Sequence, residues 1–199
     1  MVRQKVEVRR EAILAATIEQ IEARGMATVR VADVAAALDV STGLVFYHFD
    51  TKNALIVEAL AYAVDCDLSR LDKALSRSLA APDRLKRVLS SYGPTGSAPS
   101  WTLWIDAWAT ALREPTIRSA LRRLDDRWRA ALVDAVSDGV AAGDFVCADP
   151  RAAVARIGAL LDGLSVAVLV YRSVTRSQLR QWVREATASE LGLDPAALA

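Results

Sequence analysis

The chain is poor in the side chains that build metal sites and nucleophilic active sites. Its 199 residues contain two cysteines, Cys66 and Cys147, and a single histidine, His48. The cysteines show no CxxC spacing, and a His/Cys metal site needs more ligands close together, so we expect no metal and no cofactor. A nucleophile–base pair and a paired-carboxylate spacing are also missing, which argues against an enzyme. An all-helical enzyme is the weaker alternative, which any measured turnover would revive.

Charge of one sign and long uninterrupted apolar runs are missing as well. The net charge is +1, with 53% hydrophobic and 25% charged residues. This balance is typical of a soluble globular chain and does not by itself indicate nucleic acid. The N-terminus carries charges through Arg10 without the apolar core of a signal peptide, and Arg156 and Asp162 interrupt the most apolar later segment. We therefore expect a cytoplasmic location and no membrane partner.

Alternating strand patterns, internal repeats and low-complexity tails are absent too. Apolar residues recur instead at the three- and four-residue spacing of helices. The expected helices cover residues 9–24, 32–38, 42–49, 51–75, 82–92, 101–112, 115–143 and 150–170, and a last helix opens at Thr175 and extends past Ala186. The stretch GPTGSAPS at residues 93–100 is rich in turn formers and predicts a flexible loop. The sequence therefore predicts an all-α fold of about nine helices.

Residues 31–55, VADVAAALDVSTGLVFYHFDTKNAL, organise the rest of the chain. They predict a short amphipathic helix, a turn in which Asp39 has positive φ, and a second short helix with Ser41 as its N-cap. Val45 and Phe49, four residues apart, form the inward face of that second helix. Thr28 is the expected cap of the helix before the turn. This is the pattern of a helix-turn-helix, whose second helix fits the major groove of DNA.

The run STGLVFYHFDTK, from Ser41 to Lys52, resembles the DNA-binding domain of the TetR family of bacterial transcriptional regulators. The match includes residues 10–25 and Ala54-Leu55, and covers about the first quarter of the chain. It implies an all-helical homodimer that binds a palindromic operator and releases it when a small molecule enters its C-terminal domain. Two positions depart from the family. Phe46 stands where tyrosine is common and cannot donate to a phosphate, and Leu44 replaces a small or polar residue, which favours contact with a thymine methyl group.

The resemblance divides the chain into a helix-turn-helix domain, a three-helix bundle at residues 1–55, and a ligand-binding and dimerisation domain at 56–199. Within the first domain, four residues are expected to face bases, Tyr47 and His48 to contact phosphate or sugar, and Lys52 to meet a phosphate at a helix start. His48 is otherwise a partly buried support of the motif, and Arg30 is either a phosphate contact or a solvated side chain. The full candidate set for DNA binding is Arg30, Ser41, Thr42, Gly43, Leu44, Phe46, Tyr47, His48 and Lys52.

Aromatic residues gather between positions 92 and 128, where the resemblance implies an effector cavity. Aromatic side chains at helical spacing are more often plain core than a binding site, yet three tryptophans on one short helix exceed what packing requires. The expected effector is small and hydrophobic or cationic. With Asp106 or Asp162 nearby, a cationic or flat aromatic ligand would be held through cation–π contact. The candidate ligand-binding residues are Tyr92, Trp101, Trp104, Trp108, Trp128 and Asp162.

The last two expected helices are the candidate dimer interface. Residues 150–170 are apolar nearly all round and include Gly158, Gly163 and Ala167, small residues that permit close helix approach. A helix that is apolar on every side must be covered on every side, either by a second copy of the chain or within the monomer. The expected function is a dimeric repressor released by a small effector. The alternative is a DNA-binding regulator that acts constitutively or is controlled by a protein partner.

Overall fold

The computed structural model describes residues 2–75, 79–92 and 101–198, and side chains from Arg9 onward. Every regular element in these ranges is a helix, and nine of them are α-helices, which confirms the all-α prediction. The predicted loop at 93–100 lies outside the described residues.

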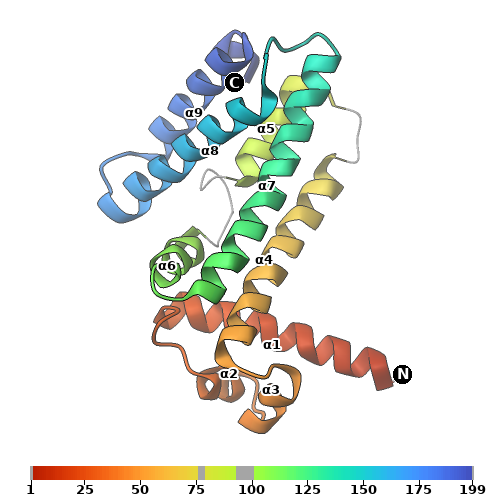
Figure 1. Cartoon of the computed structure of the whole chain (residues 1–199), viewed down its shortest axis with the longest axis vertical. Helices are drawn as coiled ribbons and strands as arrows, with labels where there is room; N and C mark the ends of the chain where they lie inside the picture. Colours follow the sequence, from red (N-terminus) through yellow and green to blue (C-terminus); the bar gives the residue numbers. More distant parts are fainter. Residues whose placement is uncertain (1, 76–78, 93–100, 199) are drawn as a thin grey trace. The chain divides into compact units, whose positions relative to one another are not determined.

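The helices follow one another along the chain in the order labelled in Figure 1. Their bounds are α1 Val2–Arg24, α2 Val31–Ala37, α3 Thr42–His48, α4 Lys52–Leu75, α5 Ala81–Tyr92, α6 Trp101–Ala111, α7 Pro115–Ala141, α8 Pro150–Val166 and α9 Arg176–Leu191. A π-helical turn, η1, continues α8 over Ala167–Tyr171, and a 3₁₀ turn, η2, covers Pro195–Leu198.

The chain divides into two compact units. The first contains Met1–Asp67 and Thr102–Leu124, and the second contains Leu68–Trp101 and Asp125–Ala199. Helices α4 and α7 each contribute one part to the first unit and the other part to the second. The two units are described separately below.

The first unit is built around α1 and the two short helices that follow it. Helix α1 ends at Gly25, whose φ of 86° is cheap only for glycine, and Gly25 N donates to Ile21 O at 2.7 Å. Ile13 and Ile21 of α1 are buried together with Val34 of α2 and Val45 of α3. The apolar spacing seen in the sequence therefore becomes the core that holds α2 and α3.

The start of α2 differs from the prediction. The helix begins at Val31 with Arg30 in the N-cap position, and the backbone N–H of Arg30 donates to Asp33 Oδ2 at 2.8 Å. Thr28 is not the cap: its hydroxyl donates to the carbonyls of Arg24 and Gly25. Thr28 thus closes the end of α1, because its short side chain reaches backward to the carbonyl of Arg24, the last residue of that helix.

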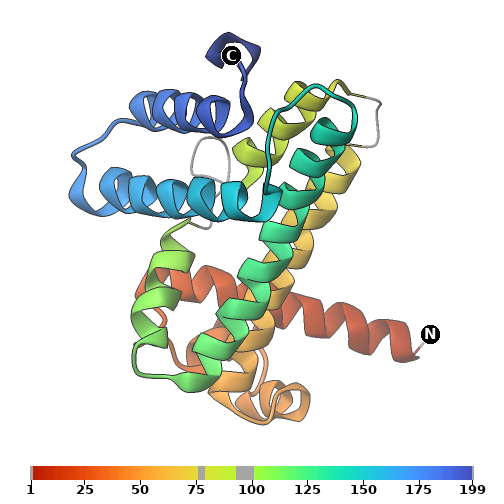
Figure 2. The same ribbon diagram turned by 45° about the horizontal axis from the view of Figure 1, so that its top comes forward.

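The second unit contains α5, the later part of α7, α8 and α9. Leu85, Val88 and Leu89 of α5 are buried, as their spacing predicts. Asp149 caps α8 by accepting from Ala152 N at 3.0 Å, with Pro150 in the first turn. Helices α8 and α9 pack against each other and lie side by side (Figure 2).

The start of α9 confirms the predicted capping box. Thr175 Oγ1 accepts from Gln178 N at 3.2 Å, and Gln178 Oε1 accepts from Thr175 N at 2.9 Å. Two of the four amides that a helix start leaves without partners are thereby satisfied. The helix ends at Gly192, whose φ is 64°.

The end of α7 is closed by an aromatic ring. Gly143 adopts φ of 79°, and Asp144 N donates to Gly139 O at 2.9 Å, which is the bond of a Schellman cap. The chain then turns back so that the buried Phe145 ring lies on Gly139, where an added Cβ would come within 2.2 Å of it. Gly139 is therefore required by packing.

The helix that begins at Pro150 reaches Tyr171, in line with the predicted end near residue 170, but its winding changes on the way. Regular α-helix stops at Val166, and a wider π turn, η1, continues to Tyr171. Arg172 then adopts the left-handed conformation with φ of 53°, and Ser173 N donates to Ala167 O at 3.1 Å. This bond spans six residues, one more than in an ordinary Schellman cap.

One helix among the described residues, Pro150–Tyr171, is long and apolar enough to cross a membrane, with a mean hydropathy of 1.9. The core helix of a soluble protein meets the same criteria, and 39% of this window is buried inside the protein. Its length and composition are weak grounds for a membrane span.

Candidate functional site

The turn between α2 and α3 has the predicted geometry. Asp39 adopts φ of 52°, and Val40 N donates to Ala35 O at 3.0 Å. Ser41 is extended and its hydroxyl accepts from Leu44 N at 3.2 Å, so it caps α3. Together these contacts fix the direction in which α3 leaves the turn.

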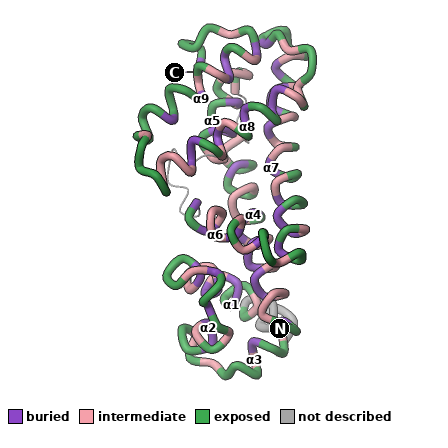
Figure 3. Tube along the Cα trace, turned by 60° about the vertical axis from the view of Figure 1, so that its left-hand side comes forward, coloured by how far each residue is buried: buried purple, intermediate pink, exposed green. Residues whose placement is uncertain are grey.

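Helix α3 has one buried face and one exposed face. Val45 and Phe49 are 1% and 2% exposed, whereas Phe46 and Tyr47 are 47% and 78% exposed. Thr42 and Gly43 are also exposed, and Leu44 and His48 are half-buried. Figure 3 shows most of α3 as exposed. Two large aromatic side chains exposed on so short a helix make this face the candidate contact surface.

The inward face is supported by α1 and α4. The Arg10 guanidinium lies 5.0 Å from the centre of the Phe49 ring and also pairs with Glu58. A cation over an aromatic face is attracted by the ring quadrupole. Phe49 therefore anchors α3 from beneath.

Gly43 has no packing role inside the chain. A Cβ added to it would meet only Ser41 Oγ, at 3.7 Å, which is ordinary contact. Its φ is not in the left-handed region. Since neither space nor backbone conformation requires glycine here, the open position suits a close approach by a partner.

The two predicted phosphate contacts at the helix starts differ in their surroundings. Arg30 is exposed at the N-cap of α2. Lys52 is half-buried in the first turn of α4, and its Nζ donates to Ala27 O at 3.2 Å. Thr51 Oγ1 caps α4 by accepting from Ala54 N at 3.0 Å. The lysine ammonium has three donors, so the bond to Ala27 leaves two others for a further acceptor.

Two polar contacts join the helix-turn-helix to the α6–α7 part of the first unit. Asp106 of α6 accepts the backbone N–H of Met26, and Asn53 Nδ2 of α4 donates to Glu114 Oε2 at 3.1 Å. Asp106, one of the two carboxylates that the sequence offers to a cationic ligand, accepts this backbone amide in the structure. The sequence could not indicate either contact, because the partners lie 80 and 61 positions apart.

A second candidate site lies in the second unit, around Tyr92 at the end of α5. The Tyr92 hydroxyl lies 3.2 Å from Asp162 Oδ1 and 3.4 Å from Asp125 Oδ1. The ring of Trp128 meets Tyr92 edge-on with centroids 5.7 Å apart, and that of Trp101 does so at 6.3 Å. Four of the six predicted ligand-binding residues are thereby brought together. We call Tyr92, Trp101, Trp128 and Asp162 the aromatic–carboxylate cluster.

The electrostatics of this cluster come from buried carboxylates. Burial is the main cause that raises the pKa of Asp162 to about 6, with a further rise from Asp125 and opposing effects from the Tyr92 hydrogen bond and Arg129. Burial, followed by Asp162 and Asp125, also raises the pKa of Tyr92. A carboxylate that is costly to ionise here would gain from a cation placed beside it.

Asp125 and Arg129 belong to this site and were missed by the sequence analysis. Arg129 Nε donates to Asp125 Oδ2 at 2.5 Å, and the Arg129 guanidinium packs close to Gly158, 3.3 Å from where its Cβ would be. Asp125 and Arg129 are four residues apart on α7, next to Trp128. That spacing was the signal that could have found them.

Trp104 and Trp108, the other two predicted ligand-binding residues, lie on α6. Both are half-buried in the first unit. Their role in ligand binding stays a prediction.

Among the described residues, no group of three or more His, Cys, Asp and Glu side chains could hold a metal ion. The two candidate sites are therefore the exposed face of α3 and the aromatic–carboxylate cluster.

Comparisons with known proteins match the chain both in its helix-turn-helix and in its C-terminal helices. A family profile described as "Bacterial regulatory proteins, tetR family" matches residues 13–59, and one described as "BetI-type transcriptional repressor, C-terminal" matches residues 81–192. The HTH-type transcriptional regulator BetI of Pseudomonas paraeruginosa is 28% identical over 165 residues, which are 79% of this chain and 79% of that protein.

Two solved structures resemble the whole chain. A protein from Saccharomonospora viridis, crystallised in complex with choline, has a TM-score of 0.81 at 28% identity and covers 93% of this chain and 98% of its own. A TetR-family protein from Rhodococcus sp. has a TM-score of 0.78 at 30% identity and covers 91% and 97%.

A helix-turn-helix with an exposed second helix, followed by an all-helical C-terminal part, defines a DNA-binding transcriptional regulator. The relatives named above are regulators, and the matches indicate no enzyme family. The chain belongs to the TetR family of bacterial transcriptional regulators, with a C-terminal part of the BetI type.

Proposed function

We propose that this protein is a transcriptional repressor that binds a palindromic operator as a homodimer and is released by a small cationic effector. The observation that carries the proposal is the exposed face of α3, where Gly43, Phe46 and Tyr47 stand in water on a helix anchored by Val45 and Phe49. The proposed domains are residues 1–55 for DNA binding and 56–199 for ligand binding and dimerisation, and the proposed location is the cytoplasm.

In the proposed DNA complex, α3 lies in the major groove, and some residues contact bases while others contact phosphate or sugar. Thr42, Gly43, Leu44 and Phe46 meet base edges, with the Leu44 methyl groups suited to thymine. Tyr47, His48, Arg30 and Lys52 meet phosphate or sugar, which supplies most of the affinity. Ser41 sets the start of the helix through its hydrogen bond to Leu44 N.

A homodimer is proposed because one short helix reads too few base pairs for specific binding. Two copies of α3 must reach successive major grooves, which are about 34–36 Å apart. The apolar surface left on the last helices supports an interface there. Val170 is 51% exposed, Tyr171 is 74% exposed and Trp182 of α9 is 39% exposed. Gly163 of α8 has no atom within 4 Å of an added Cβ, so another helix could approach it closely.

A cationic effector such as choline is proposed from the aromatic–carboxylate cluster. Quaternary ammonium groups bind to aromatic faces, and a nearby carboxylate adds charge attraction. Tyr92, Trp101 and Trp128 supply rings, and Asp162 supplies a buried carboxyl. The structural relative from Saccharomonospora viridis was crystallised with choline, which supports the same class of ligand here. Trp104 and Trp108 are proposed as further contacts on α6.

Release requires that the effector prefer one conformation of the dimer, because equal affinity for both conformations shifts nothing. Helix α4 is the proposed lever. It begins directly after the recognition helix, at Lys52, and runs to Leu75 in the second unit.

The alternative is a regulator without a small-molecule effector, which acts constitutively or answers to a protein partner. The deciding experiment is selection of bound DNA from a random pool, followed by a gel shift of the selected DNA with and without choline. A two-fold symmetric consensus and release by choline are expected. An asymmetric consensus would refute the dimer on a palindrome. A symmetric consensus whose binding ignores choline and related cations would favour the alternative.

A further inference from the structure

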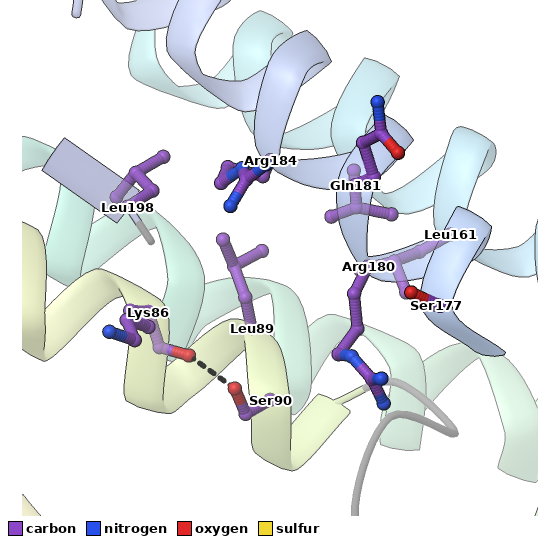
Figure 4. Close-up of a pocket in the computed structure, with 10 residues that line it drawn as sticks. Lys86, Leu89, Ser90, Leu161, Ser177, Arg180, Gln181, Arg184 and Leu198 are labelled. Atoms are coloured by element: carbon purple, nitrogen blue, oxygen red, sulfur yellow. Dashed lines mark hydrogen bonds between the residues drawn. The ribbon is translucent and has the colours of Figure 1, made fainter. Parts of the chain in front are cut away.

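A cavity of about 350 Å³ lies in the second unit, between α5, α8, α9 and η2 (Figure 4). It is lined by residues other than those of the aromatic–carboxylate cluster. Its volume falls within the usual range of small-molecule sites, roughly 300–1,000 Å³. The cavity is therefore large enough for a ligand of its own.

The lining combines an apolar part with positive charge. Leu89, Leu161 and Leu198 provide apolar surface from α5, α8 and η2, whereas Lys86, Arg180 and Arg184 provide cationic groups. None of the described residues that line it is acidic. This is the reverse of the aromatic–carboxylate cluster, where Asp162 supplies a carboxylate and Asp125 lies beside it, so the two sites suit ligands of opposite sign.

Arg184 is the residue that points most directly to a ligand. Its Nε atom is buried and has no hydrogen-bond partner among the described residues. Leu89 of α5 faces Arg184 of α9 across the cavity (Figure 4). A buried donor left without an acceptor costs free energy. Because Arg184 belongs to the lining, an anion held in the cavity would lie beside a guanidinium whose hydrogen bonding is incomplete.

We propose that this cavity binds an amphipathic carboxylate, a small organic acid whose charged end meets Arg184 and whose short hydrocarbon body contacts the leucines. The planar guanidinium matches the two oxygens of a carboxylate. The apolar part of the lining favours an organic acid over inorganic phosphate, which has no hydrocarbon surface to bury. The protein would then take a second ligand besides its cationic effector.

The experiment is isothermal titration calorimetry of the full-length protein with sodium octanoate. Neutral octanamide and inorganic phosphate serve as ligand controls. Arg184→Met removes the guanidinium while keeping a long side chain, and Arg184→Lys keeps the charge. Arg176→Met is the matched control, because Arg176 is exposed on the same helix and does not line the cavity.

Octanoate is expected to bind the wild type and the Arg176→Met variant equally, and to bind Arg184→Met at least tenfold more weakly, with partial recovery in Arg184→Lys. Octanamide and phosphate should bind at least tenfold more weakly than octanoate. The melting temperature of Arg184→Met without ligand should stay level or rise, because the buried donor is gone.

Equal octanoate binding by the wild type and Arg184→Met would overturn the proposal, as would no binding of octanoate to the wild type. Phosphate binding as tight as that of octanoate would overturn the organic-acid assignment. A lowered melting temperature of Arg184→Met with unchanged octanoate binding would assign Arg184 a structural role instead. None of these outcomes depends on operator binding or on choline.

Discussion

Asn53 Nδ2, in the first turn of α4, donates to Glu114 Oε2, directly before α7, at 3.1 Å. This contact and the one between Asp106 and the Met26 amide link the α6–α7 part of the first unit to both sides of the helix-turn-helix. The segments before α2 and after α3 are therefore tied to residues that lie far from them in the sequence.

Asn53 and Glu114 are expected to be energetically coupled. A double-mutant cycle with Asn53→Ala and Glu114→Ala should give a coupling of about 0.5–1.5 kcal/mol in the free energy of unfolding. Urea unfolding of the four proteins measures it. If the contact also carries the signal, Asn53→Ala should bind operator normally and release it less completely on adding choline. Strictly additive effects on unfolding would show that the contact contributes nothing.

Gly43→Ala should separate folding from DNA binding. The added methyl group finds only Ser41 Oγ at 3.7 Å, so the fold is expected to be unchanged or stabilised by about 0.4–1 kcal/mol. On the operator the same methyl group would stand between α3 and the bases, and affinity should fall at least tenfold. Thermal unfolding and a gel shift on the same samples test this. Unchanged operator affinity would remove Gly43 from the DNA surface.

Binding of a cationic effector should depend on pH through Asp162. Burial holds the pKa of this carboxyl at about 6, so the group is charged above that value and neutral below it. Choline affinity is therefore expected to weaken as the pH falls through about 6. Titration of choline across this range, followed by tryptophan fluorescence, measures it. Asp162→Asn should bind weakly at every pH and show no such dependence.

The same raised pKa makes a prediction for stability with the opposite sign. The folded protein holds the Asp162 proton more tightly than the unfolded chain does, so stability is lost as the pH rises from the ordinary carboxyl value of 3.8 toward about 6. Asp125, Arg129 and Tyr92 face this carboxyl and contribute to the shift. Asp162→Asn should remove this contribution to the pH dependence of unfolding. A variant with the wild-type pH dependence would show that Asp162 is not responsible.

Gly139→Ala should destabilise the protein by about 1–3 kcal/mol, since overpacking forces rings and backbone to shift. The new Cβ would lie 2.2 Å from the Phe145 ring, which is buried against the end of α7. Chemical denaturation measures the loss. Combining Gly139→Ala with Phe145→Leu removes most of the ring, and the double variant should lose less than the sum of the two single variants. Full additivity would mean that the clash is relieved elsewhere.

Gly163→Arg should split the proposed dimer without unfolding the monomer. Nothing lies within 4 Å of a Cβ at this position, so the single chain has room for a side chain. In a dimer formed through α8 and α9 the same side chain would push the partner away. Sedimentation equilibrium is expected to show a monomer with the wild-type helical content and weakened operator binding. Ala142→Arg, at an exposed position after α7, is the control. A Gly163→Arg variant that remains dimeric would move the interface elsewhere.

The features predictable from the sequence were those decided within a few residues. The positive φ of Asp39, the caps at Ser41 and Asp149, and the capping box of Thr175 and Gln178 follow from local backbone and side-chain chemistry, and all are present. The buried face of α3 followed from its spacing. Thr28 was misassigned because a threonine can serve the helix behind it as well as the one ahead, and local rules do not choose between them.

The contacts that build the candidate sites could not be predicted as well from the sequence. Tyr92 and Asp162 are 70 positions apart, and whether their side chains meet depends on how three helices pack. The sequence did not indicate the role of Asp125, because a carboxylate on a helix rich in charged residues is expected to face solvent. The cavity at Arg184 had no signal, since its lining comes from four elements whose faces become neighbours only in the folded chain.

The π turn at Ala167–Tyr171 also bears on how this chain should be aligned with its relatives. Such a turn accommodates one amino acid more than an α-helical turn of nearly the same rise. A relative with regular α-helix here would show a one-residue gap against this chain between Val166 and Arg172. Removing one residue from the turn should restore regular α-helix and leave α9 in its place, so comparisons made without that gap would shift every position of α9 by one.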